Sequence, residues 1–410
     1  MADGGIELAQ IVRAHGDAFV ELHGARLSCE QLNALHSIAI CRTARAGGRL
    51  YRCDHEGCGR EEPLYNSCHN RHCPKCQGLE RERWRRQRQA EVLPVPYFHL
   101  TFTLPHSLNG LLSQNRELLY NLVLRCGAKT ILELGADPQW LGAEMGFWGM
   151  LQSWGEALTR HVHGHFLVPG GGLSPERDRW VSPPREDYLF PNEVLGDRFR
   201  TNFLNALEQA YRRNDLRLEG RLAELQHPIR FADLIEEHRG LNWVADCSSA
   251  SAAGENVVEY LGRYLNRTAI SNHRLLALED GRVRFRFKDY RDGQSKEMDL
   301  PVEEFLRRFL MHVLPRRFVR LRYYGLLAYR KRAENLARCR ALLRASPPEV
   351  EPLPEDWAEA VAELTGVDPL LCPHCGKGRL SYLGPFDRPE EASFHLAPAP
   401  SFATSGRAPP

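Results

Sequence analysis

The spacing of apolar side chains predicts helices at the start of the chain. Apolar residues recur at helical spacing over residues 5–22, which is typical of an amphipathic helix. A second helix is predicted to begin at Ser28, because its hydroxyl can cap the first turn and Gln31 completes a capping box. After an aperiodic segment, residues 81–91 are again predicted to be helical.

The clearest strand signal lies at residues 97–105, where aromatic and β-branched side chains dominate and a proline closes the run. A strand that ends in a glycine turn is predicted within 161–172, and further strands are expected at 242–247 and 283–288. Helices are expected around 107–135 and 142–160. Strands mixed with helices at irregular spacing indicate an α+β fold.

The length of 410 residues predicts two or three domains. We expect a helical, metal-binding region that contacts DNA over 1–96 and a mixed domain over 97–300. We further expect a basic helical segment over 301–345. An acidic, proline-rich tail with a Cys-x-x-Cys knuckle is expected over 346–410. The last stretch of the tail has the composition of a disordered segment.

Composition narrows the class of protein. Hydrophobic residues make up 43% and charged residues 26% of the chain, and no apolar run approaches the ~20 residues of a membrane span. The first residues lack the pattern of a secretory signal, so a cytoplasmic protein is expected. Twelve cysteines in that compartment are expected to be reduced, which favours metal binding over disulfides.

Charge is unevenly distributed, although the formal net charge is only +2. Residues 316–344 contain ten basic residues and one acidic residue, whereas 349–363 contain six acidic residues and no basic one. Aromatic residues interleave the basic stretch, which fits backbone contacts and base stacking on DNA; a helix with solvated arginines is the alternative. The DNA-binding candidates are Arg81, Arg85, Arg316, Arg317, Arg320 and Arg322.

Cysteines cluster between residues 41 and 78 at spacings typical of zinc knuckles. We predict one closed zinc site and, from the remaining ligands, a second. The first set is Cys53, Cys58, Cys73 and Cys76, and the second is His36, Cys41, Cys68 and His72. A closed site leaves no position for substrate, so folding and DNA positioning are the expected roles. Cys372 and Cys375 form half of another knuckle, with His374, Cys339 or the other knuckles as possible partners.

Three histidines alternate along the strand predicted within 161–172. His161, His163 and His165 share one face because side chains alternate in a strand. They indicate a divalent metal site, or else polar positions on a half-exposed strand.

Two tyrosines, Tyr260 and Tyr264, are four residues apart and share a helical face. Such tyrosines usually pack in the core, but beside a metal ion their hydroxyls become candidate nucleophiles. A phenol with a pKa near 10 needs activation, and a metal that polarises a phosphate can supply it. Attack would leave a phosphotyrosine and a free 3′-hydroxyl, and it requires flexible single-stranded DNA or a hairpin.

The chain resembles a known family, the two-tyrosine HUH transposases of rolling-circle insertion sequences, named the insertion sequence ninety-one family. The likeness covers NSCHNRHCPKC at 66–76, YFHLTFTLPHSLN at 97–109, HVHGHFLVPGGGLS at 161–174, YLGRYLNRTAISNHRL at 260–275, and the stretch from FKDYRDG to EFLRRFLMHVLPRRFVRLRYYGLLA. It implies an amino-terminal zinc domain, an HUH nuclease core with a central antiparallel sheet flanked by helices, and a helical carboxy-terminal region.

The resemblance places a catalytic Mg²⁺ or Mn²⁺ on His163 and His165, with His161 as a third candidate, and places the nucleophiles at Tyr260 and Tyr264. It implies a DNA transposase that nicks and transfers single strands through 5′-phosphotyrosine intermediates. Transposon ends and hairpins are the expected partners, with host replication proteins as further candidates and the nucleoid as the expected location. Further candidate metal ligands are Asp246, Glu255, Asn256 and Glu259.

Gly164 departs from the family's pattern, which has a bulky residue between the histidines, and predicts a bulge or a weakened strand. Cys53 and Cys58 are also spaced more widely than expected for a knuckle pair. Two other functions stay open: a rolling-circle replication initiator with the same chemistry, and a zinc-dependent DNA-binding regulator without cleavage activity.

Overall fold

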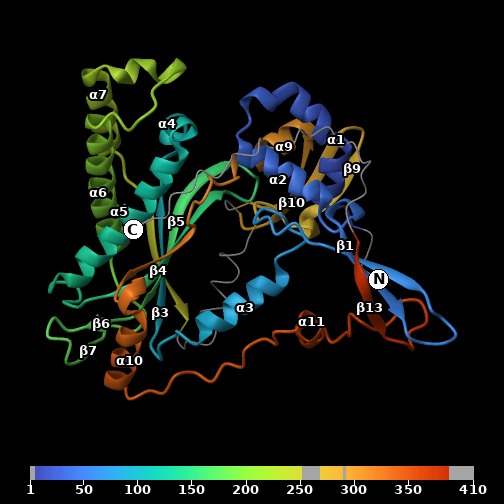
Figure 1. Ribbon diagram of the computed structural model, residues 1–410. Coiled ribbons are helices and arrows are strands. Elements are labelled where there is room, and N and C mark those ends of the chain that lie inside the picture. The colour runs from blue at the N-terminus through green and yellow to red at the C-terminus, as the bar shows by residue number, and fades with distance from the viewer. Residues whose placement is uncertain (1–4, 252–267, 290–291, 387–410) are drawn as a thin grey trace, which may run out of the picture.

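The computed structural model describes residues 5–251, 268–289 and 292–386 (Figure 1). At its centre is a five-stranded sheet in the order β12-β4-β5-β3-β8, and every neighbouring pair is antiparallel. This confirms the α+β class with a central antiparallel sheet. The strands are β3 (Tyr97–Thr103), β4 (Gly146–Trp154), β5 (Arg160–Pro169), β8 (Ala245–Ser251) and β12 (Leu321–Gly325).

Helices cover both faces of this sheet. Phe98, Phe102 and Phe166 point to one face and belong to the largest buried cluster, together with residues of α4 (Asn109–Gln114), α5 (Arg116–Ala136), α6 (Asn192–Arg212) and α7 (Pro228–Arg239). On the other face, Tyr97 and Trp148 pack with residues of α3 (Gly78–Gln89) and α10 (Arg332–Leu343). A two-stranded ribbon, β6 (Gly172–Leu173) with β7 (Trp180–Val181), follows β5.

The prediction of a helix over 142–160 is wrong, because this segment contains β4 in the interior of the sheet. All nine residues of β4 are buried, so the strand lacks the polar-apolar alternation that marks a half-exposed strand. Gly149 pairs with Phe166, and a Cβ at Gly149 would lie 2.6 Å from that ring. The glycine is therefore needed for close approach of the aromatic ring.

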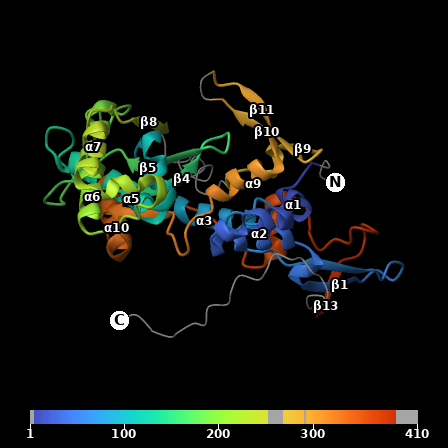
Figure 2. The ribbon, with the colours of Figure 1, turned by 90° about the horizontal axis from the view of Figure 1, so that it is seen from above.

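The second lobe is built from both ends of the described chain (Figure 2). Helices α1 (Leu8–His23) and α2 (Cys29–Ile40) share a buried cluster with α9 (Val302–Met311) and with the sheet of β9 (Leu275–Glu279), β10 (Arg282–Lys288) and β11 (Ser295–Pro301). The capping box at Ser28 and Gln31 is present, with N–H to side-chain oxygen distances of 2.9 and 3.3 Å. Within the described parts of the chain, residues 269–289 and 292–300 therefore pack with the amino-terminal helices, although they lie inside the domain predicted over 97–300.

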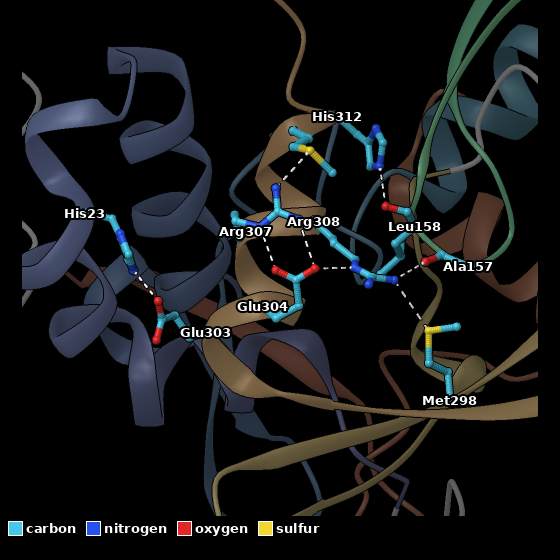
Figure 3. Close-up of polar contacts among 10 residues, drawn as sticks. His23, Ala157, Leu158, Met298, Glu303, Glu304, Arg307, Arg308 and His312 are labelled. Atoms are coloured by element: carbon cyan, nitrogen blue, oxygen red, sulfur yellow. Dashed lines mark hydrogen bonds and ion pairs between the residues drawn. The ribbon is translucent and has the colours of Figure 1, made fainter. Parts of the chain in front are cut away.

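Helix α9 joins the two lobes (Figure 3). The His312 ring, just beyond α9, contacts the carbonyl oxygen of Leu158 at 3.2 Å, in the turn between β4 and β5. Arg308 donates to the carbonyl of Ala157 at 3.2 Å, and Glu303 pairs with His23 of α1 at 2.8 Å. The basic segment 301–345 is not helical throughout, since β12 lies between α9 and α10 as an edge strand of the central sheet.

The carboxy-terminal segment returns to the amino-terminal lobe. After α10 it passes α3, forms α11 (Trp357–Thr365), and adds β13 (Leu380–Phe386) to the hairpin of β1 (Gly48–Cys53) and β2 (Glu61–Tyr65) (Figure 1). Arg83 of α3 donates to the carbonyl of Glu355 at 3.0 Å, and Arg86 pairs with Glu363. The acidic stretch therefore packs on the arginine-rich helix. Among the described residues, no helix is both long and apolar enough for a bilayer span.

Candidate metal centres and nuclease site

The first cysteine cluster lies at the end of α2 in the second lobe, which is called the zinc-binding lobe from here on. Cys41 caps α2, while Cys68, Cys73 and Cys76 come from the loop before α3. The four Sγ atoms lie within 4.8 Å of one another, and those of Cys68 and Cys76 are 3.6 Å apart. A hydrogen bond from Cys68 lowers the pKa of the Cys41 thiol, which favours the thiolate form that binds metal.

The second cysteine cluster joins distant parts of the chain. Cys53 and Cys58 lie at the end of β1 and in the following turn, and Cys372 and Cys375 precede β13. The Sγ atoms of Cys53 and Cys375 are 3.7 Å apart, and those of Cys58 and Cys372 are 3.9 Å apart. Pairing of β1 with β13 brings the two halves together, which identifies the partners of the carboxy-terminal knuckle.

The predicted division of the ligands is wrong. Cys53 and Cys58 do not share a site with Cys73 and Cys76, because β1 carries them to β13 instead. The ligand set of His36, Cys41, Cys68 and His72 is wrong as well, since among the described residues neither histidine belongs to a group of four. The Nε2 atom of His72 accepts a hydrogen bond from the Leu314 N–H at 3.3 Å, so this ring links the knuckle to the segment after α9.

Both clusters fit structural zinc by their donor sets. Four cysteine sulfurs in close proximity are the ligands of a closed tetrahedral zinc site, which leaves no position for substrate. Cys41, Cys73 and Cys76 are buried in the cluster that also holds α1, α2 and α9. Zinc binding is thereby coupled to the packing of this lobe.

The histidine row lies on β5 in the middle of the central sheet. His161, His163 and His165 share one face as predicted, with successive ring centroids 4.8 and 4.5 Å apart. His163 and His165 are 6% and 8% exposed, which places both imidazoles inside the protein. Val162 and Phe166 point to the opposite face, into the cluster under α5 and α6.

Hydrogen bonds orient both buried rings. The Nδ1 of His163 donates to the carbonyl of His161 at 3.0 Å, so Nε2 keeps its lone pair for a ligand. The Nδ1 of His165 lies 2.8 Å from Nε2 of His99 on the neighbouring strand β3. Burial lowers the pKa of His163 to about 3 and that of His165 well below 6.5. Both rings are therefore in the neutral form that binds metal.

His99 and Asp246 complete the polar row across three strands. Thr101 of β3 pairs with His165 on one side and with Asp246 of β8 on the other, so all three lie on one face. Burial lowers the pKa of His99 to about 4, and the Asp246 carboxylate opposes this shift. Sequence analysis missed His99. Its signal was the alternation of polar His99, Thr101 and Thr103 with apolar neighbours in the predicted strand.

The remaining residues singled out in the sequence are His161 and Gly164 on β5 and five residues of the segment after β8. The Nδ1 of His161 lies 3.1 Å from Nε2 of His106, at the more exposed end of the row. Gly164 marks no bulge: it pairs in register with Phe102 and Leu151, and a Cβ there would lie 3.0 Å from the Phe166 ring. Outside the described residues lie Glu255, Asn256, Glu259, Tyr260 and Tyr264.

Comparison with known proteins decides the family. A family model described as a putative transposase matches residues 146–335, and one described as a transposase zinc-binding domain matches residues 11–104. A "Putative transposase y4qJ" of Sinorhizobium fredii is 42% identical over 390 residues, which cover 94% of this chain and 97% of that protein. The chain belongs to the insertion sequence ninety-one family of transposases.

A further relative of this transposase is the "Transposase for insertion sequence element IS801" of Pseudomonas savastanoi pv. phaseolicola. It is 28% identical over 348 residues, which cover 84% of this chain and 82% of that protein. No solved structure matches the chain. The zinc-binding family model ends at residue 104, so the carboxy-terminal half of the second cysteine cluster lies outside both matched segments.

Some of the arginines predicted to bind DNA are engaged by other groups of the transposase, whereas others are exposed. Arg85 makes a two-pronged ion pair with Glu82 at 2.6 and 2.8 Å, and Arg81 is half-buried near the first cysteine cluster. Arg322 stacks on Phe318, whereas Arg320 lies 5.0 Å above the Trp154 ring and donates to the Leu151 carbonyl. Arg316 and Arg317 are exposed and form no ion pair with the residues that the structure describes.

Proposed function

We propose that this transposase nicks and rejoins single-stranded DNA as an HUH nuclease. In this proposal, His163 and His165 hold a catalytic Mg²⁺ or Mn²⁺, and Tyr260 and Tyr264 are the nucleophiles. The observation that carries the proposal is the pair of buried, neutral imidazoles on one strand face, each held through Nδ1. Imidazoles oriented in this way are pre-arranged ligands rather than incidental polar positions.

The surrounding groups fit a divalent ion. Asp246 offers a carboxylate on the same face, and His161 offers a further imidazole. A divalent ion held by these groups would polarise a phosphate oxygen and stabilise negative charge in the transition state. His99 supports His165 through the 2.8 Å contact and is the candidate positioning residue for that ligand.

Chain connectivity supports a role for the tyrosines at this sheet. Ser251 pairs with Tyr97 at one end of β3. Ile270 belongs to the same buried cluster as Trp154, which lies beyond the opposite end of β3. Ser251 and Ile270 stand on either side of both tyrosines in the sequence, and these two described residues lie toward opposite ends of the sheet that carries the histidines.

The proposed step conserves the energy of the phosphodiester. A tyrosine oxygen attacks phosphorus in line, a bond from tyrosine oxygen to phosphorus forms, and the bond from phosphorus to the 3′ oxygen breaks. The phenolic proton is released and the 3′ oxygen takes up a proton, which leaves a 5′-phosphotyrosine and a free 3′-hydroxyl. Reversal of this step with another 3′-hydroxyl rejoins strands without ATP, and a second tyrosine permits a second cut before the first is resealed.

Single strands and hairpins at transposon ends are the substrates that suit this site. In-line attack requires a phosphodiester that can turn toward the nucleophile, and a single strand or a hairpin does this more readily than a paired duplex. Transposases act on the ends of their own elements, so the proposed substrate is one terminal strand of the element. Host replication proteins are proposed only as suppliers of that single strand.

The test is a covalent adduct. The purified full chain is incubated with a labelled single strand of an element end and Mn²⁺, and the adduct is detected by denaturing gel electrophoresis. We expect the double variant Tyr260→Phe, Tyr264→Phe and the double variant His163→Ala, His165→Ala to lose the adduct. The histidine variant should keep its zinc, and His227→Ala, an exposed histidine before α7, should behave like wild type.

The outcomes separate the rival functions. DNA binding by the wild-type chain without any adduct would favour a zinc-dependent regulator and overturn the nuclease proposal. If the covalently held strand is rejoined only to the end from which it was cut, the result would favour a replication initiator. Nicking by the double histidine variant at the wild-type rate would remove the metal role from β5.

A further inference from the structure

A polar cavity lies between the amino-terminal helices and the segment that follows α9, and none of its lining residues belongs to the histidine row. Its volume is about 410 Å³, within the range of roughly 300–1,000 Å³ that ligand pockets occupy. Its walls are α2, the loop at 68–72 between two ligands of the first cysteine cluster, and residues 313–317 after α9. All three walls are fixed by the zinc cluster or by the packing of α9, so the cavity is preformed.

The lining of this cavity is strongly cationic. Arg71, Arg316 and Arg317 face one acidic lining residue, Glu30. Within the described ranges, none of the three arginines forms an ion pair, and Arg71 is held by a 2.9 Å hydrogen bond from its guanidinium to the Phe318 carbonyl. Three guanidinium groups against one carboxylate favour an anionic ligand, and guanidinium groups match phosphate oxygens in geometry.

The same cavity offers groups that can contact a nucleobase. Asn33 and Ser37 come from α2, and His69 and Asn70 come from the knuckle loop. The hydroxyl of Ser37 lies 3.0 Å from the amide oxygen of Asn33, so both side chains are ordered on the cavity wall. Amide, hydroxyl and imidazole groups hydrogen-bond to base edges, and an imidazole can also stack on a base.

Two lining residues have positive φ angles, which residues other than glycine rarely adopt. His69 has φ 51° and Arg317 has φ 57°, and they lie on two different walls. Such conformations are concentrated at functional sites.

We propose that this cavity binds one nucleotide of the DNA strand, with its phosphate held by Arg71, Arg316 and Arg317. The zinc-binding lobe then acts as a fixed clamp that sets the register of the strand relative to the scissile phosphate. The inference rests on the proposed nuclease function, because the histidine site defines where the strand is cut.

The first test measures binding without any divalent ion. The full chain is titrated with a fluorescein-labelled single-stranded oligonucleotide, and anisotropy is followed at several salt concentrations. Each phosphate contact with a single strand contributes about 0.7 to the slope of log affinity against log salt. We expect Arg316→Ala with Arg317→Ala to lower the slope by about 1.4 and to weaken binding about tenfold or more.

Two matched variants make the result specific. Arg213→Ala with Arg230→Ala removes two exposed arginines from the α6–α7 side and should leave the affinity within about twofold of wild type. Ser37→Phe fills the cavity without a change of charge and should weaken binding about tenfold. Zinc content and the unfolding temperature of each variant confirm that the fold is kept.

The proposal is overturned if the two double arginine variants lose affinity equally, or if Ser37→Phe binds as wild type does. In either case the arginines act as a general electrostatic surface and the cavity holds no nucleotide. These outcomes are independent of the nuclease proposal, because the titration requires neither metal nor cleavage. Conversely, a chain that forms no covalent adduct but shows the expected binding pattern would keep the cavity and lose the nuclease.

Discussion

Cys53 and Cys375 are separated by 322 positions in the chain, yet their Sγ atoms lie 3.7 Å apart. A zinc ion shared by their cluster would close a loop that contains most of the described chain but leaves out α1 and α2. The loop includes the segment between α10 and β13, which contacts Arg83 and Arg86 of α3. The second cysteine cluster therefore fixes the carboxy-terminal segment against the arginine-rich helix as well as against the β1–β2 hairpin.

The double variant Cys372→Ser, Cys375→Ser should lose one of two zinc ions. We expect zinc per chain, measured by elemental analysis, to fall from about two to about one, because serine replaces two of four thiolates. Limited proteolysis should then cut first between α10 and β13. Cys29→Ser is the matched control, since Cys29 is exposed and belongs to neither cluster. Retention of two zinc ions by the double variant would contradict the second site.

His99→Ala should weaken metal binding at the histidine site without a loss of zinc. His99 holds His165 through the 2.8 Å contact, and loss of such a partner typically costs about 10–100-fold in metal affinity. Mn²⁺ titration followed by electron paramagnetic resonance gives the affinity directly, and His99→Gln should recover part of it. An unchanged Mn²⁺ affinity in His99→Ala would show that His99 only packs.

Gly149→Ala should destabilise the central sheet. The added Cβ would lie 2.6 Å from the Phe166 ring inside the sheet, and overpacking of a core typically costs about 1–3 kcal/mol. We expect a lower unfolding temperature in scanning calorimetry. Gly110→Ala is the control, because its Cβ meets only ordinary contact with Leu222 at 3.7 Å, and it should be neutral or slightly stabilising.

The ion pairs of Glu304 predict a pH dependence of stability (Figure 3). Hydrogen bonds from Arg307 and then Arg308 lower the pKa of Glu304 from 4.5 to about 2. A depressed carboxyl pKa means that the stabilisation is complete above pH 4.5 and is lost as the pH falls toward 2. Glu304→Gln should therefore cost about 0.5–1 kcal/mol at pH 7, after solvent screening, and almost nothing near pH 2.

To test this, the unfolding temperatures of wild type and Glu304→Gln are compared between pH 7 and pH 2. The difference between the two proteins should shrink as the pH falls. A difference that stays constant between pH 7 and pH 2 would show that the carboxylate charge does not contribute to stability.

Local features were predicted where local chemistry is sufficient. The cap at Ser28, the strand at 97–103 and the shared face of His161, His163 and His165 follow from hydrogen bonding and from the two-residue repeat of a strand. The strand β4 was missed because it is buried on both faces, so its side chains carry no alternation. β12 was missed because the basic and aromatic residues around it suit either a helix or an edge strand.

The amino-acid sequence by itself determined the family, the presence of zinc ligands and the histidine row, because these depend on residue types at short spacing. Only the tertiary structure decided how the cysteines divide between two clusters and that His99 supports His165. Short spacing brings thiolates near one another, but strand pairing determines which pairs meet. β13 adds to β1, and so Cys372 and Cys375 take the positions beside Cys53 and Cys58 that the sequence assigned to Cys73 and Cys76.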